Sequence, residues 1–238
     1  MPKKYKLLPD DTIKWYGVTL YRIQALQDFG QIKSGNIGGY VEGEHNLSHT
    51  GRCWVGNNAK VWDRARVEDD AQVRDEAELS GLSVAGGHSQ VEDHARLSHR
   101  ARVRDHAQVG GDARVTDAAQ VSGTAVVYDA AQVGGRAIVY DAARVGGSAV
   151  VDGDTLVCGN ARAFGDTHLS GGQINGDFLA LGDDDAARDG DGRPSQAVDP
   201  AQDRGEERQR HRHLGQLEHV IAAVAHDPGA DLHQLLAQ

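Results

Sequence analysis

Four histidines, the residue type that most often serves as a general base, lie close together in the sequence. They are His88, His94, His99 and His106. An imidazole gains and loses a proton near neutral pH, so one histidine beside a substrate is enough for proton transfer. Eighteen residues separate His88 from His106, and Asp70 precedes His88 by the same interval. If the fold repeats at this interval, these three stack in one column where the carboxylate could orient an imidazole or a metal could bind. Solvent-exposed histidines at turns are the simpler interpretation.

The sequence around these histidines is built from repeats of six residues. Every sixth residue from Val55 to Leu169 gives 20 positions, of which 18 hold Val or Leu. The residue two places before each position is small in all 20 cases. This alternation is typical of a short strand with one buried face, and the Asp, Gly and Asn residues that follow indicate a turn. Residues 53–176 are therefore predicted to form an all-β parallel β-helix, a hexapeptide-repeat solenoid of stacked coils.

Three six-residue sides per coil give the eighteen-residue period that the histidine column needs. From Asp105 onward, the second residue after each large aliphatic position alternates between Asp and Gly. This period places Gly123 between Asp105 and Asp141, which keeps like charges from stacking about 4.8 Å apart. A two-sided solenoid with a twelve-residue coil is the alternative, and it would stack these aspartates into a ladder suited to binding calcium or ice. Three successive aspartates break a twelve-residue period and favour three sides: Asp63, Asp69 and Asp75.

The outward positions of the strands are mostly polar. Gln72, Gln90 and Gln108 share one column, in which the side-chain amides are expected to form a hydrogen-bonded ladder. Late in the repeat several outward positions become apolar, with two tyrosines nearby: Val126, Ile138, Val150, Leu156, Tyr128 and Tyr140. An exposed apolar patch predicts a face for self-association or for a protein partner, unless the C-terminal tail covers it.

Residues 1–52 are predicted to form an N-terminal β cap over the open edge of the first coil. Three strands are expected, with turns at 9–11 and 17 between them: residues 5–8, 12–16 and 19–26. Val41 continues the hexad spacing but lies two residues out of phase with Val55. The coil is therefore expected to begin near Gly39 and to absorb two extra residues near Thr50.

A specific motif lies in the second half of this cap. The segment from Asp28 to Glu42 reads DFGQIKSGNIGGYVE, and NLS at 46–48 and CWV at 53–55 follow it. It resembles the YdcK-like hexapeptide-repeat proteins of bacteria and their prophages, which share a DF-x-x-(V/I)-K-x-G-x-x-GG-(W/Y)-V segment before the repeats. The resemblance covers about residues 1–176. Because that family is grouped with left-handed β-helix acyltransferases, the resemblance implies a left-handed coil and an acetyltransferase that uses acetyl-CoA.

The related γ-class carbonic anhydrases bind zinc with an H-x4-H pair, and His94 and His99 have that spacing. A catalytic zinc site needs three protein ligands. The third is expected upstream near Asn58, which is not a histidine. No metal site is therefore expected.

The net charge of −10 is concentrated at the C-terminal end. Residues 177–238 hold 13 Asp and Glu against 6 Arg, which leaves about −3 for the body and does not favour nucleic-acid binding. Residues 183–212 read as a disordered acidic tail, with a short helix expected at 214–225. A native tail, a fusion and a shifted reading frame remain open. The two distant cysteines and the lack of a signal peptide or membrane span predict a reduced, cytoplasmic protein.

Two functions from different classes remain. The first is a non-catalytic solenoid, a scaffold or a self-associating structural or binding protein that needs no cofactor. The alternative is an acetyl-CoA-dependent acyltransferase with His88, His94 or His106 as the general base. The hexads run without an inserted loop, and such loops normally build the substrate pocket of an enzyme. Their continuity favours the non-catalytic solenoid.

Overall fold

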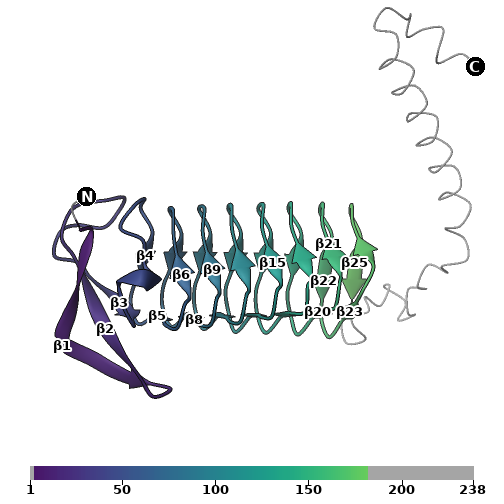
Figure 1. The fold of residues 1–238 in the computed structure, drawn as a ribbon. Coiled ribbons are helices and arrows are strands. Elements are labelled where there is room, and N and C mark those ends of the chain that lie inside the picture. The colour runs from purple at the N-terminus through teal and green to yellow at the C-terminus, as the bar shows by residue number, and fades with distance from the viewer. Residues whose placement is uncertain (1–2, 182–238) are drawn as a thin grey trace, which may run out of the picture. The chain divides into compact units, whose positions relative to one another are not determined.

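The computed structural model describes residues 3–181, which form a coil of stacked strands with a hairpin at its N-terminal end (Figure 1). The strands form three sheets, and neighbours in each sheet are hydrogen-bonded. Sheet 1 contains, in spatial order, β1 (Tyr5–Trp15), β2 (Val18–Ala25), β3 (Ile37–Val41), β5 (Lys60–Val61), β8 (Glu78–Leu79), β11 (Arg96–Leu97), β14 (Arg114–Val115), β17 (Gln132–Val133), β20 (Val150–Asp152) and β23 (His168–Ser170).

The other two sheets contain only strands of the coil. Sheet 2 contains β4 (Trp54–Val55), β7 (Gln72–Val73), β10 (Gln90–Val91), β13 (Gln108–Val109), β16 (Val126–Val127), β19 (Arg144–Val145), β22 (Arg162–Phe164) and β25 (Leu179–Leu181). Sheet 3 contains β6 (Arg66–Val67), β9 (Val84–Ala85), β12 (Arg102–Val103), β15 (Gln120–Val121), β18 (Ile138–Val139), β21 (Leu156–Val157) and β24 (Gln173–Ile174). A short 3-10 helix, Glu44–Asn46, precedes β4.

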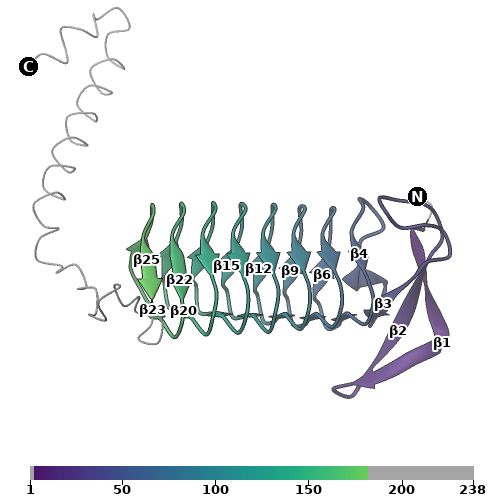
Figure 2. The ribbon, with the colours of Figure 1, turned by 180° about the vertical axis from the view of Figure 1, so that it is seen from behind.

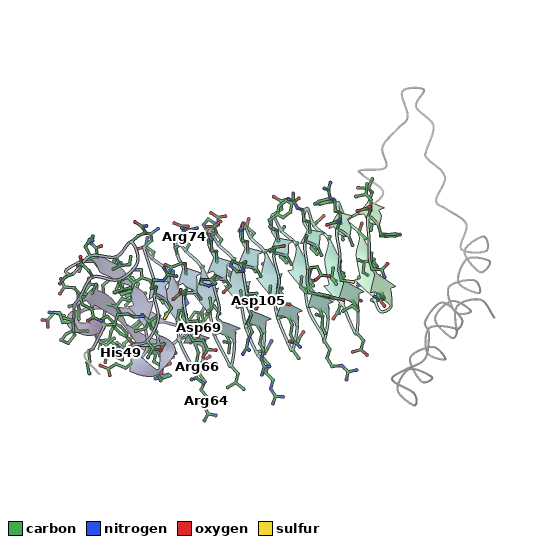
Figure 3. The ribbon with its side chains drawn as sticks, turned by 90° about the horizontal axis from the view of Figure 1, so that it is seen from above. His49, Arg64, Arg66, Asp69, Arg74 and Asp105 are labelled. Carbon is green, nitrogen blue, oxygen red and sulfur yellow. The ribbon has the colours of Figure 1, made fainter. Side chains whose placement is uncertain are left out.

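Strand register confirms three sides per coil. Val91 pairs in parallel with Val73 on one side and with Val109 on the other, each three hexads away in the sequence. The two-sided alternative is wrong. Inward Val and Ala residues such as Val109 and Ala107 are fully buried. Each buried Val stabilises the coil by roughly 1.5–3 kcal/mol relative to an exposed one, and neighbouring coils share these contacts. Outward residues such as Arg64 and Arg66 project from the surface (Figure 3).

The Asp and Gly residues at the corners do more than keep like charges apart, because the backbone there adopts a conformation that few residue types tolerate. The second residue after each large inward position has a positive φ, for example +59° at Asp105 and +68° at Gly123. The Gly123 N–H donates to Asp105 Oδ2 at 3.0 Å, one coil away. At Gly123 the backbones of two coils are in close contact, because a Cβ there would lie 2.7 Å from the backbone nitrogen of Asp141. Corners that alternate between Asp and Gly therefore combine a hydrogen bond at one level with close backbone packing at the next.

The start of the coil confirms the predicted two-residue insertion. Val41 pairs with Val61, and Leu47 pairs with Val67. In the sequence, the two members of each pair lie two positions further apart than Trp54 and Gln72, which pair in the next part of the coil. The two extra residues therefore lie between Leu47 and Trp54. The expected turn at residues 9–11 is wrong, because β1 runs through them with a bulge between Leu8 and Thr12 and stays paired with β2. Both strands and the loop that follows them lie at the N-terminal end of the coil (Figure 2).

The coil also extends beyond residue 176, where the hexads were predicted to end. Leu156 pairs with Gln173 and Arg162 with Leu179, and both separations are one position shorter than in the regular coils. One residue is thus missing from the last coil, which shifts the pattern out of phase and hides it in the sequence. The expected helix at 214–225 and most of the predicted tail lie outside the described residues. Both cysteines, Cys53 and Cys158, are buried and not paired with each other.

Candidate functional site

A groove of about 610 Å³ lies where the cap meets the first coils. One wall is the loop between β2 and β3, represented by Gly30 and Ile32, and the other is the start of sheet 2 with Trp54. Phe29 holds the loop in place, because its ring meets the Trp54 ring edge-on at 5.5 Å. Asp28 shapes the loop by accepting the N–H of Ser34 at 2.9 Å. The hexads carry no inserted loop, and the wall of this groove comes from the cap instead.

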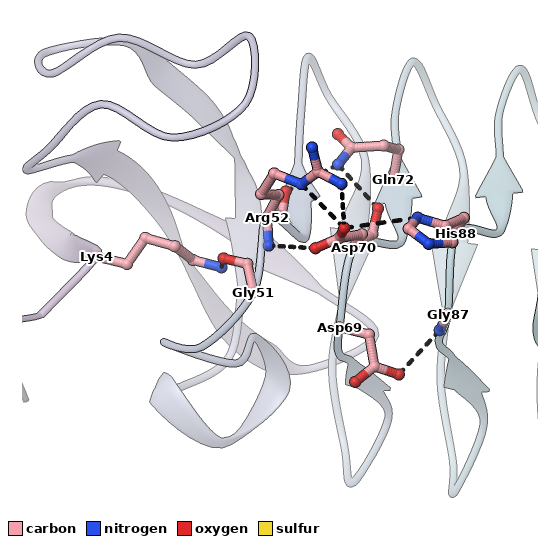
Figure 4. Close-up of polar contacts among 8 residues, drawn as sticks. All are labelled: Lys4, Gly51, Arg52, Asp69, Asp70, Gln72, Gly87 and His88. Carbon is pink, nitrogen blue, oxygen red and sulfur yellow. Dashed lines mark hydrogen bonds and ion pairs between the residues drawn. The ribbon is translucent and has the colours of Figure 1, made fainter.

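The predicted column of Asp70, His88 and His106 is present at the edge of this groove. His88 Nδ1 lies 3.5 Å from Asp70 Oδ2, and the rings of His88 and His106 stack with their centroids 4.9 Å apart. A fourth member, Arg52, stands one coil before Asp70 (Figure 4). It was missed by the sequence analysis, although it precedes Asp70 by the same interval and follows from the same arithmetic.

Arg52 dominates the electrostatics of the column. Its backbone N–H donates to Asp70 Oδ1 at 2.7 Å, and its Nε and one terminal nitrogen donate to Oδ2 at 2.9 and 2.5 Å. These side-chain hydrogen bonds, followed by the backbone one, hold the pKa of the Asp70 carboxyl below its usual value. The side-chain contacts with Asp70 also raise the pKa of Arg52. Asp70 is therefore held by the arginine, and His88 lies beyond good hydrogen-bond distance of it.

The outward glutamines of the groove form hydrogen bonds with other residues and not with one another. Gln72 Nε2 donates to the carbonyls of Arg52 and Asp70 at 2.9 and 3.2 Å. Gln90 Oε1 accepts from Arg74 at 2.7 Å, and Arg74 also pairs with Glu92. The predicted glutamine ladder is therefore wrong, although the three glutamines do share one column.

The remaining candidate histidines lie elsewhere. His94 is one hexad from His88 and so occupies the next corner of the coil, away from the column. His99 lies at another corner, where its Nδ1 is 3.4 Å from Asp117 Oδ1. Within residues 3–181, no group of three His, Cys, Asp or Glu side chains is arranged to hold a metal ion.

The residues predicted to form one apolar association face are distributed over all three sheets. Val126 lies on sheet 2, Val150 on sheet 1, and Ile138 and Leu156 on sheet 3. Only Ile138 and Leu156 are direct neighbours. Tyr128 packs over Gly146 toward Phe164, and the neighbouring Cys158 raises the pKa of Tyr140. A single late apolar face is therefore wrong, and one two-residue patch on sheet 3 remains.

These features define the class of protein: an all-β parallel solenoid with three strands per coil, an N-terminal hairpin, and a groove between the β2–β3 loop and the first coils. Two segments of the coil, residues 107–123 and 131–147, match the family model described as the YdcK beta solenoid repeat. The chain is thus similar to YdcK-like repeat proteins, as the cap motif indicated. No curated protein matches it. None of the described helices has the length and apolar character needed to span a membrane.

Proposed function

We propose that this protein is a non-catalytic scaffold whose rigid coil presents binding surfaces. The observation that carries the proposal is the pairing of Asp70 with Arg52 by three hydrogen bonds. A histidine that acts as a general base is usually oriented by a carboxylate or carbonyl partner. Here the carboxylate of the column is held by the arginine, and the exposed imidazole of His88 lies 3.5 Å away.

The construction of the coil supports a scaffold. Each coil donates backbone hydrogen bonds to the next, as in Gln90 N–H to Ala107 O at 3.0 Å and Gln108 N–H to Ala125 O at 2.9 Å. The corners are fixed by residues with positive φ and by carboxylate contacts between coils. A stack fixed in this way holds surface side chains at a regular spacing of about 4.8 Å without domain motion.

Self-association through the sheet 3 patch forms part of the proposal, with a second copy as the partner. Ile138 and Leu156 are adjacent, partly exposed and apolar. We expect light scattering to show an oligomer that Ile138→Asp with Leu156→Asp disperses, because a charge cannot be buried unpaired in an interface. Val126→Asp with Val150→Asp is the matched control, since these residues lie on two other sheets and should leave the oligomer intact. A wild-type protein that is monomeric throughout contradicts self-association.

The groove beside His88 favours a second candidate, an acyltransferase that uses acetyl-CoA. Its volume of about 610 Å³ is within the range of small-molecule sites, and His88 lines it. In this alternative His88 is the general base and His106 stacks behind it. His94 has no part in it, because it lies at another corner.

A thermal-shift titration of the full chain with acetyl-CoA separates the two candidates. The scaffold proposal predicts that His88→Ala leaves the response to acetyl-CoA unchanged, because no ligand contact depends on that imidazole. His94→Ala is the control for the loss of a corner histidine. Saturable stabilisation that His88→Ala abolishes and His94→Ala retains contradicts the scaffold and favours the acyltransferase.

A further inference from the structure

Tyr16 has an unusual position at the tip of the β1–β2 hairpin. Its φ is +45° and that of Gly17 is +84°, so a bulky aromatic residue occupies a turn position that normally selects Asn, Asp or Gly. The side chain is also 77% exposed. Strain of this kind costs on the order of 1–3 kcal/mol and is characteristic of functional positions. The strained, exposed ring of Tyr16 is therefore a candidate for contact with a ligand.

The Tyr16 ring is held in a defined orientation. It stacks on Trp62 with ring centroids 6.0 Å apart and an interplanar angle of 23°, and it meets Trp15 edge-on at 5.5 Å. Trp62 is buried in a small apolar cluster with Leu20 and Tyr40. The ring is thus an exposed platform on a fixed base, and it borders a second groove of about 410 Å³ on sheet 1.

A column of hydroxyl groups continues from Trp62 along this second groove. Ser80, Ser98 and Thr116 occupy the same corner in successive coils, so they follow one another at about 4.8 Å. Trp62 and Thr116 are three coils apart, which corresponds to about 14 Å along the axis of the solenoid. The groove therefore provides hydrogen-bonding groups along a length greater than one ring.

The charged residues of the second groove leave one positive charge in excess. Glu78, Arg96 and Arg114 are adjacent on sheet 1, and Arg96 Nε lies 3.7 Å from Glu78. Arg114 is exposed, and in the described part of the chain no carboxylate lies within ion-pair distance of it. Asp117 lies at the same end, where it accepts a hydrogen bond from Thr116 Oγ1 at 3.2 Å and faces His99. The unpaired guanidinium of Arg114 is therefore the group that an anion would meet in this groove.

We propose that this groove binds a nucleotide, with the base stacked on Tyr16 and the phosphates beside Arg96 and Arg114. A base on an aromatic side chain contributes about 1–3 kcal/mol, and a guanidinium matches the geometry of a phosphate. A nucleoside diphosphate fits better than a monophosphate, because the platform and Arg114 are about three coils, or roughly 14 Å, apart. The proposal does not depend on the scaffold or on the His88 groove.

The test is a calorimetric titration of the full chain with ADP, adenosine and pyrophosphate. We expect ADP to bind more tightly than either part alone. Tyr16→Asn should weaken ADP binding by about tenfold or more, the equivalent of about 1.4 kcal/mol or more. It should not unfold the hairpin, because Asn tolerates a positive φ better than Tyr. Arg114→Gln should weaken ADP binding by a similar factor, whereas Arg102→Gln, an exposed outward arginine on sheet 3, should have no effect.

Three results would overturn the proposal. The first is no saturable heat with ADP at about 1 mM, the weak limit of specific binding. The second is an affinity for ADP that equals the affinity for adenosine or the affinity for pyrophosphate, because one half of the proposed site would then contribute nothing to binding. The third is binding that Tyr16→Asn leaves unchanged. Because acetyl-CoA contains an ADP group, Tyr16→Asn and His88→Ala also show which groove is responsible for any binding of that cofactor.

Discussion

Replacing Gly123 by alanine is expected to destabilise the protein by about 2–5 kcal/mol. The φ of +68° costs an L-residue roughly 1–2 kcal/mol, and a Cβ at this position would lie 2.7 Å from the nitrogen and 2.9 Å from the oxygen of Asp141. These are backbone atoms of the next coil, so accommodating the Cβ requires the two coils to move apart at this corner. Urea unfolding followed by circular dichroism measures the change.

Gly86→Ala is the matched control for this prediction. Gly86 also lies at a corner, but its φ is ordinary and the nearest atom to an added Cβ is the side-chain oxygen Asp69 Oδ2 at 3.4 Å. We expect a change of no more than about 0.5 kcal/mol, because the carboxylate can move aside. Equal losses at Gly123 and Gly86 would show that close packing at the alternate corners does not determine stability.

Lys4→Ala is expected to cost about 2–5 kcal/mol in the free energy of unfolding, from a cavity and from unsatisfied backbone groups. The Lys4 side chain is buried, with 1% of its surface exposed. Its Nζ donates to the carbonyl of Cys53 at 2.9 Å and to those of Thr50 and Gly51 at 3.4 Å. These three carbonyls belong to the segment that absorbs the two-residue insertion. Lys4 therefore joins the cap to the first coil.

Lys6→Ala tests whether burial causes this effect, since Lys6 lies two residues further on, in β1, and is exposed. Its loss should change stability by no more than about 0.5 kcal/mol. Lys4→Met retains most of the apolar stem, so it should recover the packing part of the loss and leave the hydrogen-bonding part. If Lys4→Ala and Lys6→Ala unfold at the same urea concentration, Lys4 has no special role in attaching the cap.

The coil could be predicted from the sequence because each of its units is local and recurs at a fixed interval. Once six residues form one side, a step of three hexads gives every partner, and Val91 does pair with Val73 and Val109. The column of Asp70, His88 and His106 followed from the same rule. That rule also separates residues two hexads apart, so it could have shown that Val126, Ile138 and Val150 face different sides.

The groove could not be predicted in this way, because its wall depends on contacts without a period. Phe29 meets Trp54 across a stretch of chain that precedes the regular hexads, and nothing in the spacing indicates that contact. The last coil was missed for a related reason, since one absent residue before Gln173 shifts the pattern. Repetition thus determines the coil, whereas single contacts and single-residue shifts determine the ends, including the groove beside the cap.

The central claim is that Arg52, rather than His88, is the main partner of Asp70, and NMR titration of the Asp70 carboxyl carbon tests it most directly. The hydrogen bonds from Arg52 lower the pKa of Asp70, so the ion pair is present above the ordinary carboxyl range and is lost as the pH falls through the lowered pKa. We predict that the pKa of Asp70 in the wild type lies below the usual range of an aspartate and that Arg52→Gln raises it back toward that range. A wild-type Asp70 with an ordinary pKa, or one that Arg52→Gln does not change, would leave the carboxylate available to His88 and contradict the non-catalytic scaffold.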